Sequence, residues 1–378
     1  MSTTATAPVR DAAYASQWQL TVRRFSKHRI AVLTLWMLII LYGIALFSEF
    51  FAPYSSEWND VERSYAPPQM VRWDIATGFY TRAVVKRVDE VTFRQGYVED
   101  SSVVIPLGFF VKGEAYKLWG LIPADRHFFS IDKKRFDKLN YTTNVQPVCY
   151  LLGADKLGRD VLSRILHGAR ISLSVGLVGI FLSFVLGLVI GGISGYLGGA
   201  VDNVIQRFIE VLNSFPKLPL WLALGAAFPP DWSPLRIYFM ITIVLSIFGW
   251  TGLARVVRGK ILSLREEDYA TAARLMGASH PRIIFKHLLP GFTSHIIVSL
   301  TLSFPGMILG ETSLSFLGLG LRPPIVSWGV MLQDCMNIQA VVNYPWLLLP
   351  SVFIIITVLC YNYLGDGLRD AADPYAER

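Results

Sequence analysis

The chain has 378 residues, of which 53% are hydrophobic and only 17% are charged. It is richer in apolar residues than an ordinary soluble domain, which argues against a soluble protein. Its net charge of +7 does not require a nucleic acid partner, because basic residues beside membrane spans account for such an excess.

The apolar residues are gathered in five runs that contain no Asp, Glu, Lys or Arg. Each run is long enough to cross a bilayer core of about 30 Å as a helix, which takes roughly 20 residues. One charge at the centre of such a helix costs about 2.5 to 3.5 kcal/mol, so uninterrupted runs predict membrane-spanning helices. The runs cover residues 30–48, 171–201, 237–254, 287–310 and 335–365. A shorter apolar stretch over 218–228 is interpreted as a sixth span.

Basic residues before the first run indicate the orientation. Arg23, Arg24, Lys27 and Arg29 crowd its leading edge, so the positive-inside rule places the N-terminus in the cytoplasm. The run exceeds the apolar part of a signal peptide and lacks a small-residue cleavage site after it, which predicts a retained anchor. Six spans then return the C-terminus to the cytoplasm.

These spans divide the chain into five predicted parts. They are a cytoplasmic segment (1–29), the first span (30–52), an extracytoplasmic insertion (53–150), a core with five spans (151–366) and a cytoplasmic tail (367–378). In the insertion, aromatic and β-branched residues alternate with charges, as in VTFRQGYVED, and glycines supply turns, which indicates a small strand-rich domain. A lid without a ligand of its own and a docking domain both fit this pattern.

A polar segment, DYATAARLMGASHPRIIFKHLLP over 268–290, lies between two apolar runs in a loop predicted to extend from 255 to 290. Negative charge at its start favours a helix N-terminus, and its small and apolar residues offer a contact face for a partner. Gly277 permits a turn, and Pro281 suits the first turn of a second helix. An amphipathic helix on the membrane surface is the alternative. The residues expected to form the contact or its supports are Glu267, Asp268, Tyr269, Ala272, Ala273, Leu275, Met276, Gly277, Pro281 and Pro290.

Small residues recur in the second apolar run. Gly187, Gly191, Gly195 and Gly199 are spaced by four, so they are expected on one helical face where another helix packs closely. Before them, the charged stretch over 155–170 predicts an amphipathic helix at the outer membrane surface.

Glu311 ends an otherwise neutral run. An ionisable group near membrane depth is a candidate pathway or gate residue. Its position is predicted to be near the outer interface, where local hydrogen bonds with Thr312 and Ser313 are the structural alternative.

The sequence contains no pattern typical of a metal site or an ATPase. Cys149, Cys335 and Cys360 lack metal-ligand spacing and are interpreted as structural, with a bridge between Cys149 and Cys335 as the alternative. The nearest match to a phosphate loop, at Gly259 and Lys260, has Ala254 in place of the first glycine and Ile261 in place of Ser or Thr. We therefore expect no enzyme active site.

Several separate blocks resemble one transporter family. They are LGADKLGRDVLSRILHGARISLSVG (152–176), GYLGGAVDNVIQRFIEVLNSFP (195–216), the polar segment 268–290, ETSLSFLGLGLRPPIVSWGVML (311–332) and NYLGDGLRDAADP (362–374). In this order they resemble the C-type permease subunit of oligopeptide and dipeptide ABC importers, which have nickel-transporting relatives. The resemblance covers most of the chain outside the insertion. Thr271, His287 and Gly291 depart from the commonest form of the loop.

The resemblance implies an all-α polytopic protein with six transmembrane helices of the type I ABC importer permease kind, in the bacterial cytoplasmic (inner) membrane. It also implies that the polar segment is an ATPase-coupling loop. The implied partners are a second homologous permease subunit, two ATP-binding subunits that hold ATP and Mg, an extracytoplasmic substrate-binding protein and membrane lipid. No cofactor is expected in this chain.

The implied function is ATP-driven import of oligopeptides or dipeptides. Nickel complexes, glutathione or another small solute are alternative cargoes. An ion-coupled secondary transporter is disfavoured, because paired intramembrane acids and inverted repeats are not found in the sequence.

Overall fold

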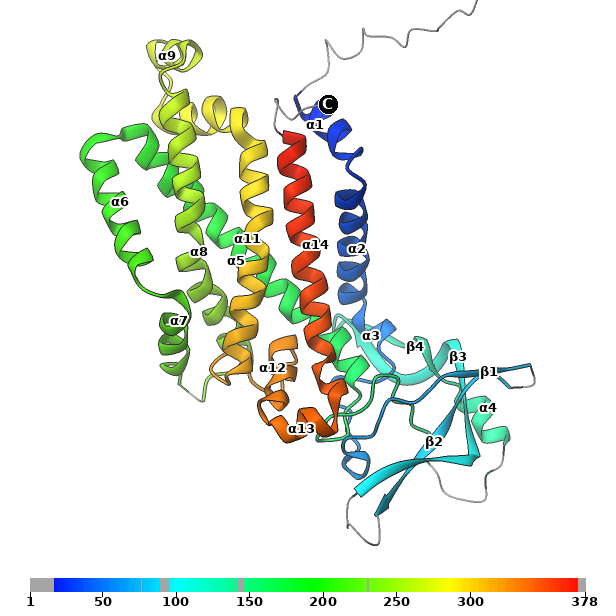
Figure 1. Ribbon diagram of the computed structural model, residues 1–378. Coiled ribbons are helices and arrows are strands. Elements are labelled where there is room, and N and C mark those ends of the chain that lie inside the picture. The colour runs from blue at the N-terminus through cyan, green and yellow to red at the C-terminus, as the bar shows by residue number, and fades with distance from the viewer. Residues whose placement is uncertain are drawn as a thin grey trace, which may run out of the picture.

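A computed structural model describes residues 17–75, 77–88, 95–139, 141, 146–229 and 231–372. Long helices run side by side as a bundle, and a small β-sheet lies at one end of it (Figure 1). The helices of the bundle are α2 (Arg29–Leu46), α5 (Val161–Leu197), α6 (Gly199–Ser214), α7 (Lys217–Ala226), α8 (Pro234–Leu264), α11 (Thr293–Phe316) and α14 (Leu349–Ala372).

Shorter elements lie at the two ends of the bundle. The α-helices are α1 (Gln17–Phe25), α3 (Ser48–Phe51), α4 (Lys133–Lys138), α9 (Asp268–Leu275), α10 (His280–Arg282), α12 (Trp328–Leu332) and α13 (Ile338–Asn343). The 3-10 helices are η2 (Val61–Arg63), η4 (Leu289–Phe292), η5 (Gln333–Met336) and η6 (Pro345–Leu348), and η3 (Ile283–Leu288) is a π-helix. The strands are β1 (Arg72–Asp74), β2 (Gly78–Val88), β3 (Gln95–Leu118) and β4 (Ile122–Ile131).

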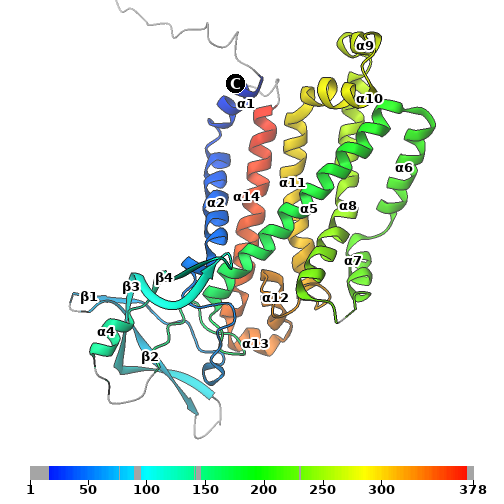
Figure 2. The same ribbon diagram turned by 180° about the vertical axis from the view of Figure 1, so that it is seen from behind.

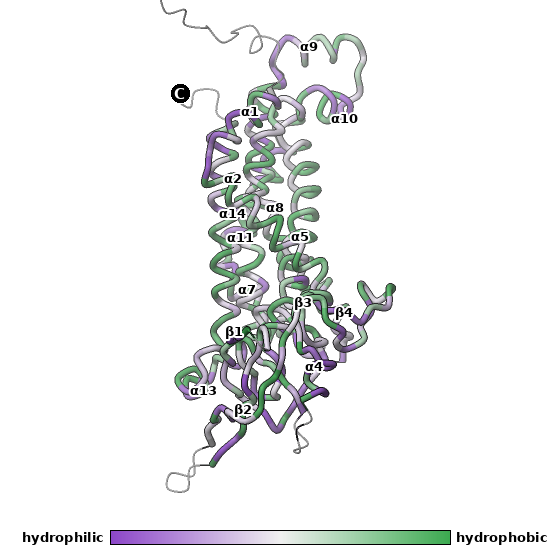
Figure 3. The backbone as a smooth tube through the Cα atoms, turned by 90° about the vertical axis from the view of Figure 1, so that its right-hand side faces the viewer, coloured by the Kyte–Doolittle hydropathy of each residue, from purple (hydrophilic) through white to green (hydrophobic). Residues whose placement is uncertain are grey.

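Within the described residues, five helical segments are long and apolar enough to cross a membrane, and each overlaps one of the five predicted runs. The prediction of five long apolar helices is therefore confirmed. Figure 3 shows that hydrophobic residues dominate the middle of the bundle and that hydrophilic residues are more frequent at its ends. The five segments are Arg29–Leu46, Val161–Leu197, Pro234–Leu264, His280–Phe316 and Pro345–Ala372.

The sixth predicted span, over 218–228, is not confirmed as a crossing by a single helix. Its helix, α7, has only 10 residues, which at 1.5 Å per residue is about 15 Å, or half of the bilayer core. Pro216 is in an extended conformation (φ −65°, ψ 122°) directly before α7, so the chain breaks between α6 and α7. The two helices follow one another along the side of α8 (Figures 1 and 2).

Three predicted segments also differ from the structure. The charged stretch over 155–170 does not form a separate surface helix, because Val161 begins α5, which continues to Leu197. At about 55 Å, α5 is longer than the bilayer is thick. Residues 255–264 are the last turns of α8 rather than a loop, and α14 continues through the first residues of the predicted tail to Ala372.

Close packing of α5 on α8 depends on three of the four spaced glycines. A Cβ at Gly187 would lie 2.9 Å from Leu253, one at Gly191 would lie 2.5 Å from the Ala254 carbonyl oxygen, and one at Gly195 would lie 2.8 Å from that of Arg258. Gly199 does not lie on this face, so the prediction that it shares the face with the other three glycines is wrong. It lies beyond the end of α5, begins α6 with φ +57°, and a Cβ there would meet nothing within 4 Å.

The sheet is antiparallel in the order β1-β2-β3-β4. It lies within the part of the chain for which strands are predicted. Val88 pairs with Gln95 at one end of the β2–β3 hairpin, and Leu118 pairs with Ile122 at the turn of the β3–β4 hairpin. The buried apolar residues that stabilise it are Ala83, Val103, Ile105, Leu107, Ile131, Phe136 and Cys149.

The two ends of the bundle carry different elements. Helices α1 and α9 and the C-terminal end of α14 lie at one end, whereas the sheet, α12 and α13 lie at the other (Figures 1 and 2). We call these the α9 end and the sheet end.

Candidate functional site

The α9 end presents a short helix with an exposed apolar side. Leu275 and Met276 are 83% and 80% exposed, and Tyr269 is 44% exposed. Asp268 is in the first turn, where a negative charge interacts favourably with the helix dipole, and Ala272 is exposed beside these side chains. Contiguous exposed apolar side chains mark interaction sites. This surface (Asp268, Tyr269, Ala272, Leu275 and Met276) is therefore the first candidate site, called here the α9 surface.

The opposite side of α9 packs on the chain itself. Ala270 and Ala273 are buried against Ile283, Ile284 and Leu288 of the following π-helix η3. Ala273 therefore does not belong to the exposed contact face predicted from the sequence. The reason is that residues three apart share a helix face, and in α9 this face is taken by η3.

Glycine and proline shape the chain around α9. Gly277 has φ +80°, and the N–H groups of Gly277 and Ala278 donate to the carbonyls of Arg274 (3.0 Å) and Ala273 (3.1 Å), which is a Schellman C-cap. Pro281 lies in the first turn of α10, and Pro290 lies in the first turn of η4. A turn that ends in this way holds α9 at a defined angle to α10.

Arg258 in the last turns of α8 and Arg265, the residue directly after that helix, connect the α9 end to α5 and α6. Arg265 donates from Nη1 to the carbonyls of Gly195 (3.2 Å) and Tyr196 (3.3 Å). Arg258 donates from Nε and Nη2 to the two carboxylate oxygens of Asp202, both at 2.5 Å. Ser194 also donates to Asp202 at 2.5 Å. Sequence reasoning missed these contacts, although the spacing of seven places both arginines on one face of α8.

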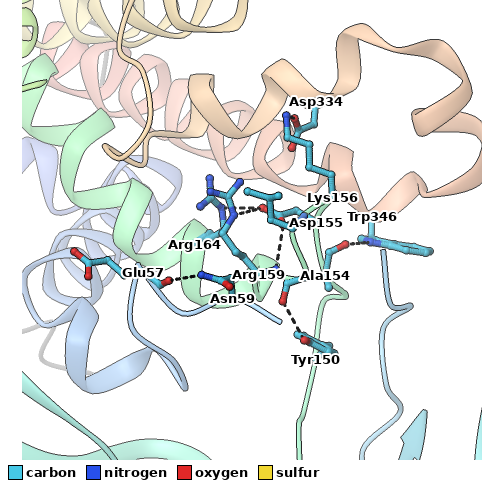
Figure 4. A network of polar contacts seen from close by, with 12 residues as sticks. Glu57, Asn59, Tyr150, Ala154, Asp155, Lys156, Arg159, Arg164, Asp334 and Trp346 are labelled. Carbon is cyan, nitrogen blue, oxygen red and sulfur yellow. Dashed lines mark hydrogen bonds and ion pairs between the residues drawn. The ribbon is translucent and has the colours of Figure 1, made fainter. Parts of the chain in front are cut away.

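A second polar cluster lies at the sheet end, in the loop before α5 (Figure 4). Asp155 Oδ1 accepts the N–H groups of Leu157 (2.9 Å) and Arg159 (3.0 Å), and its Oδ2 lies 2.7 Å from Arg159 Nε and 3.4 Å from Arg164 Nε. Lys156 Nζ lies 2.8 Å from Asp334 Oδ1. The cluster therefore joins the loop to α5 and to η5.

This loop also joins the insertion to the core. Gly158 has φ +68°, and a Cβ there would lie only 1.7 Å from the Asp60 carbonyl oxygen, so a side chain would not fit. Trp346 Nε1 donates to the Ala154 carbonyl at 2.9 Å, and Tyr150 donates to the Gly158 carbonyl at 3.0 Å. These contacts favour a structural role for the cluster.

Asp160 begins α5 as its N-cap. One carboxylate oxygen accepts both the N–H of Ser163 (2.7 Å) and its hydroxyl (2.6 Å). Burial raises the pKa of Asp160 to about 7, although the hydrogen bonds from Ser163 act in the opposite direction.

Glu311 lies in α11 with its side chain fully buried. Ser315 and Ser327 donate to Oε1 at 2.8 and 2.7 Å, and Ser172 donates to Oε2 at 3.3 Å. Each serine hydroxyl also accepts a backbone N–H, from Leu321, Val330 and Trp328 respectively. Glu311 thus organises the loop between α11 and α12 against α5. Thr312 and Ser313, the local partners named from the sequence, do not bind Glu311. Ser313 donates to the Leu309 carbonyl, and Thr312 Oγ1 has no hydrogen-bond partner among the described residues.

The cysteines are unpaired. Cys149 and Cys360 are buried and Cys335 is partly buried, all as free thiols, so the alternative of a bridge between Cys149 and Cys335 is wrong. Among the residues that the structure describes, no group of three or more His, Cys, Asp and Glu side chains has a metal-binding arrangement.

The fold and the exposed helix define the chain as a polytopic helical membrane protein. Two family models match the chain. Residues 187–378 match the binding-protein-dependent transport system inner membrane component, and residues 16–68 match the N-terminal TM domain of oligopeptide transport permease C.

Individual relatives agree with the family models. The chain is 42% identical over 226 residues to the oligopeptide transport system permease protein OppC of Haemophilus influenzae, covering 60% of this chain and 70% of that one. It is 31% identical over 355 residues to the dipeptide transport system permease protein DppC of Lactococcus lactis, covering 94% and 89%. A solved structure of the MetNI methionine ABC transporter is similar at 17% identity and a TM-score of 0.43, covering 55% and 96%.

The chain belongs to the family of binding-protein-dependent transport system inner membrane components, and within it to the C-type permeases. The resemblance inferred from the sequence blocks is confirmed. The protein is therefore a multi-pass transport subunit of the inner membrane.

Proposed function

We propose that this permease forms half of the translocation pathway of an ATP-driven importer of oligopeptides or dipeptides. The observation that carries the proposal is the α9 surface, an exposed apolar helix face directly connected to the end of a membrane-crossing helix. Peptide cargo is supported by the names of the relatives, which are oligopeptide and dipeptide permeases.

The α9 surface is proposed to bind a cytoplasmic ATP-binding subunit, which holds ATP and Mg. The geometry supports transmission of force. Only three residues, Arg265 to Glu267, separate α8 from α9, and Arg265 and Arg258 join α8 to the ends of α5 and α6. A displacement of α9 would therefore move three helices together and change the side from which the pathway is open.

The proposed orientation places the α9 end in the cytoplasm and the sheet end outside. Both termini of the described chain lie at the α9 end (Figure 1), as the basic residues before the first span require under the positive-inside rule. The chain would then cross the membrane six times, with α6 and α7 together making one crossing. Their 16 and 10 residues add up to about 39 Å of helix.

A second permease subunit is proposed to cover one side of α6. Val204, Phe208 and Val211 form an exposed apolar stripe there, at the spacing of one helical face. The exposed ion pair of Arg207 and Glu210 lies on the same helix, and charged groups are costly against lipid tails. An apolar stripe beside exposed charges suits a protein partner better than hydrocarbon. A substrate-binding protein would dock at the sheet end.

The test uses a double variant of the α9 surface, Leu275→Glu with Met276→Glu, produced together with the ATP-binding subunits. Two charges on the apolar contact should abolish both co-purification of the ATPase and ATP-dependent peptide uptake in a permease-deletion strain. The matched control is Ile75→Glu, which changes an 88% exposed apolar residue at the sheet end and should leave co-purification of the ATPase intact. Undiminished ATPase binding by the double variant, or uptake that follows a proton gradient rather than ATP, would overturn the proposal.

A further inference from the structure

The turn of the β3–β4 hairpin touches the end of the first membrane span. The indole N–H of Trp119 donates to the carbonyl of Leu46 at 2.8 Å, and Leu46 is the last residue of that span. The Trp119 ring also contacts Phe47, with centroids 5.5 Å apart. The turn is therefore held at the depth where α2 leaves the hydrocarbon core of the membrane.

The rest of the hairpin is attached to the same place. Phe128 of β4 contacts the rings of Phe50 and Phe51 in α3, with centroids 6.1 and 5.3 Å apart. His127, which is buried, lies with Nδ1 2.6 Å from the Ala52 carbonyl oxygen and Nε2 3.0 Å from that of Glu114. These contacts set the height of the hairpin relative to the membrane.

The turn exposes apolar side chains rather than the polar ones usual in hairpin turns. Leu121 is 79% exposed, Ile122 is 52% exposed and Trp119 is 44% exposed. Trp119 has φ 53°, a left-handed conformation that bulky residues rarely adopt. Figure 3 shows the hairpin projecting sideways from the helices, with hydrophobic residues at its turn.

The apolar turn continues an apolar face of α2. Trp36 and Ile40 are exposed on α2, as is Phe47 directly after it, and their spacing of four and seven puts them on one stripe. This stripe leads to the Trp119 ring. The exposed Lys117 lies two residues before Trp119, and a lysine there can keep its charged group in the polar layer of the membrane interface.

We infer that the β3–β4 turn (Trp119–Ile122) inserts into the headgroup–acyl boundary of the bilayer and anchors the insertion to the membrane surface. Phospholipid is the occupant that these contacts favour, because the turn is continuous with the outward apolar stripe of a spanning helix. Trp is enriched at membrane–water interfaces, and interfacial segments bury apolar side chains about 5–10 Å into this boundary. The anchor requires that α2 crosses the membrane but does not require that an ATPase binds the α9 surface. The anchor and the proposed function can therefore be disproved separately.

The experiment measures the depth of Leu121 directly. A nitroxide is attached to Leu121→Cys in the full chain, with the three natural cysteines changed to Ala, in nanodiscs of phosphatidylcholine and phosphatidylglycerol. The matched control is Val88→Cys. Val88 is similarly apolar and is 53% exposed, but it ends β2, which points away from the bundle (Figure 1).

Oxygen, which concentrates among acyl chains, should relax the Leu121 label several-fold more strongly than a water-soluble nickel chelate does. The Val88 label should show the reverse. Equal behaviour of the two labels would overturn the anchor, as would shielding of the Leu121 label from both reagents, because that result shows that protein rather than lipid surrounds the turn.

A second measurement uses the unmodified chain, so that it does not depend on folding of the variant without cysteines. A lipid-soluble diazirine probe, photolysed in the same nanodiscs and located by mass spectrometry, should label residues 119–122 and not residues 85–88. Absence of label from 119–122 would contradict membrane insertion.

Discussion

Arg258 of α8 and Asp202 of α6 form a bidentate ion pair. Arg258 Nη2 lies 2.5 Å from Asp202 Oδ2, and Arg258 Nε lies 2.5 Å from Asp202 Oδ1. Ser194 of α5 donates to the same carboxylate, so three helices meet at one acidic side chain. Such charge-assisted, bidentate contacts are stronger and more directional than neutral hydrogen bonds.

Removing either partner of this pair should loosen the three helices. Because the guanidinium is partly exposed, Arg258→Ala is expected to lower the free energy of unfolding by only about 1–2 kcal/mol. A double-mutant cycle with Asp202→Asn, followed by thermal unfolding in detergent, should give a coupling energy of about 1 kcal/mol or more. Additive effects of the two changes would show that the contact contributes nothing.

A methyl group at Gly191 should disrupt the contact of α5 with α8. Its Cβ would lie 2.5 Å from the Ala254 carbonyl oxygen and 2.8 Å from Ala254 Cα, so the helices must separate, and overpacking of this kind costs about 1–3 kcal/mol. The control is Gly252→Ala in α8, where a Cβ meets nothing within 4 Å, and it should be neutral or slightly stabilising. Equal thermal midpoints for the two variants would refute the close-packing assignment.

Changes at Glu311 should separate a structural role from a role in the pathway. Glu311→Ala leaves three buried serine hydroxyls without their acceptor, and we expect it to lower the free energy of unfolding by about 2–4 kcal/mol. Glu311→Gln keeps one acceptor oxygen and should lower the free energy of unfolding by less than Glu311→Ala does. If both variants are as stable as the unmodified chain but fail to transport, Glu311 acts in the pathway instead.

Asp160 should make stability depend on pH. Burial raises its pKa in the folded chain to about 7, from the ordinary value of 3.8. Between these two values the unfolded chain loses the proton while the folded chain keeps it. The contribution of Asp160 to the free energy of unfolding therefore falls as pH rises from about 4 to about 7, by up to about 4 kcal/mol.

The comparison variant is Asp160→Asn, which retains an N-cap oxygen but does not titrate. Relative to the unmodified chain, it should become more stable on going from pH 5 to pH 8 in thermal unfolding experiments. A constant difference between the two proteins over this range would be inconsistent with the raised pKa.

Gly277 should be needed for coupling rather than for ATPase binding. Its φ of +80° costs an L-residue about 1–2 kcal/mol, so Gly277→Ala should tilt or fray α9 while leaving the exposed side chains of the α9 surface present. We expect retained ATPase association and hydrolysis with reduced peptide uptake. The control is Gly259→Ala, because a Cβ at Gly259 would meet nothing within 4 Å and its φ is ordinary for a helix. Full peptide uptake by Gly277→Ala would count against the coupling role.

Features that depend only on neighbouring residues could be predicted from the sequence. Exclusion of charge from a run of about 20 residues is a local property, and it predicted the five long apolar helices that the structure contains. The acidic start of α9 and the turn at Gly277 were also predictable, because helix ends are set by residues within one turn. The sequence blocks that carry the family resemblance are likewise contiguous.

The side of each helix that packs against the rest of the chain could not be predicted from the sequence. Ala272 and Ala273 are neighbours of the same type, yet Ala273 is buried because η3 packs against that side of α9. The three serines that bind Glu311 include Ser172, 139 residues away, and Trp119 finds its acceptor at Leu46, 73 residues away. Contacts of this kind arise from how helices and strands pack, which periodicity and spacing along one segment do not encode.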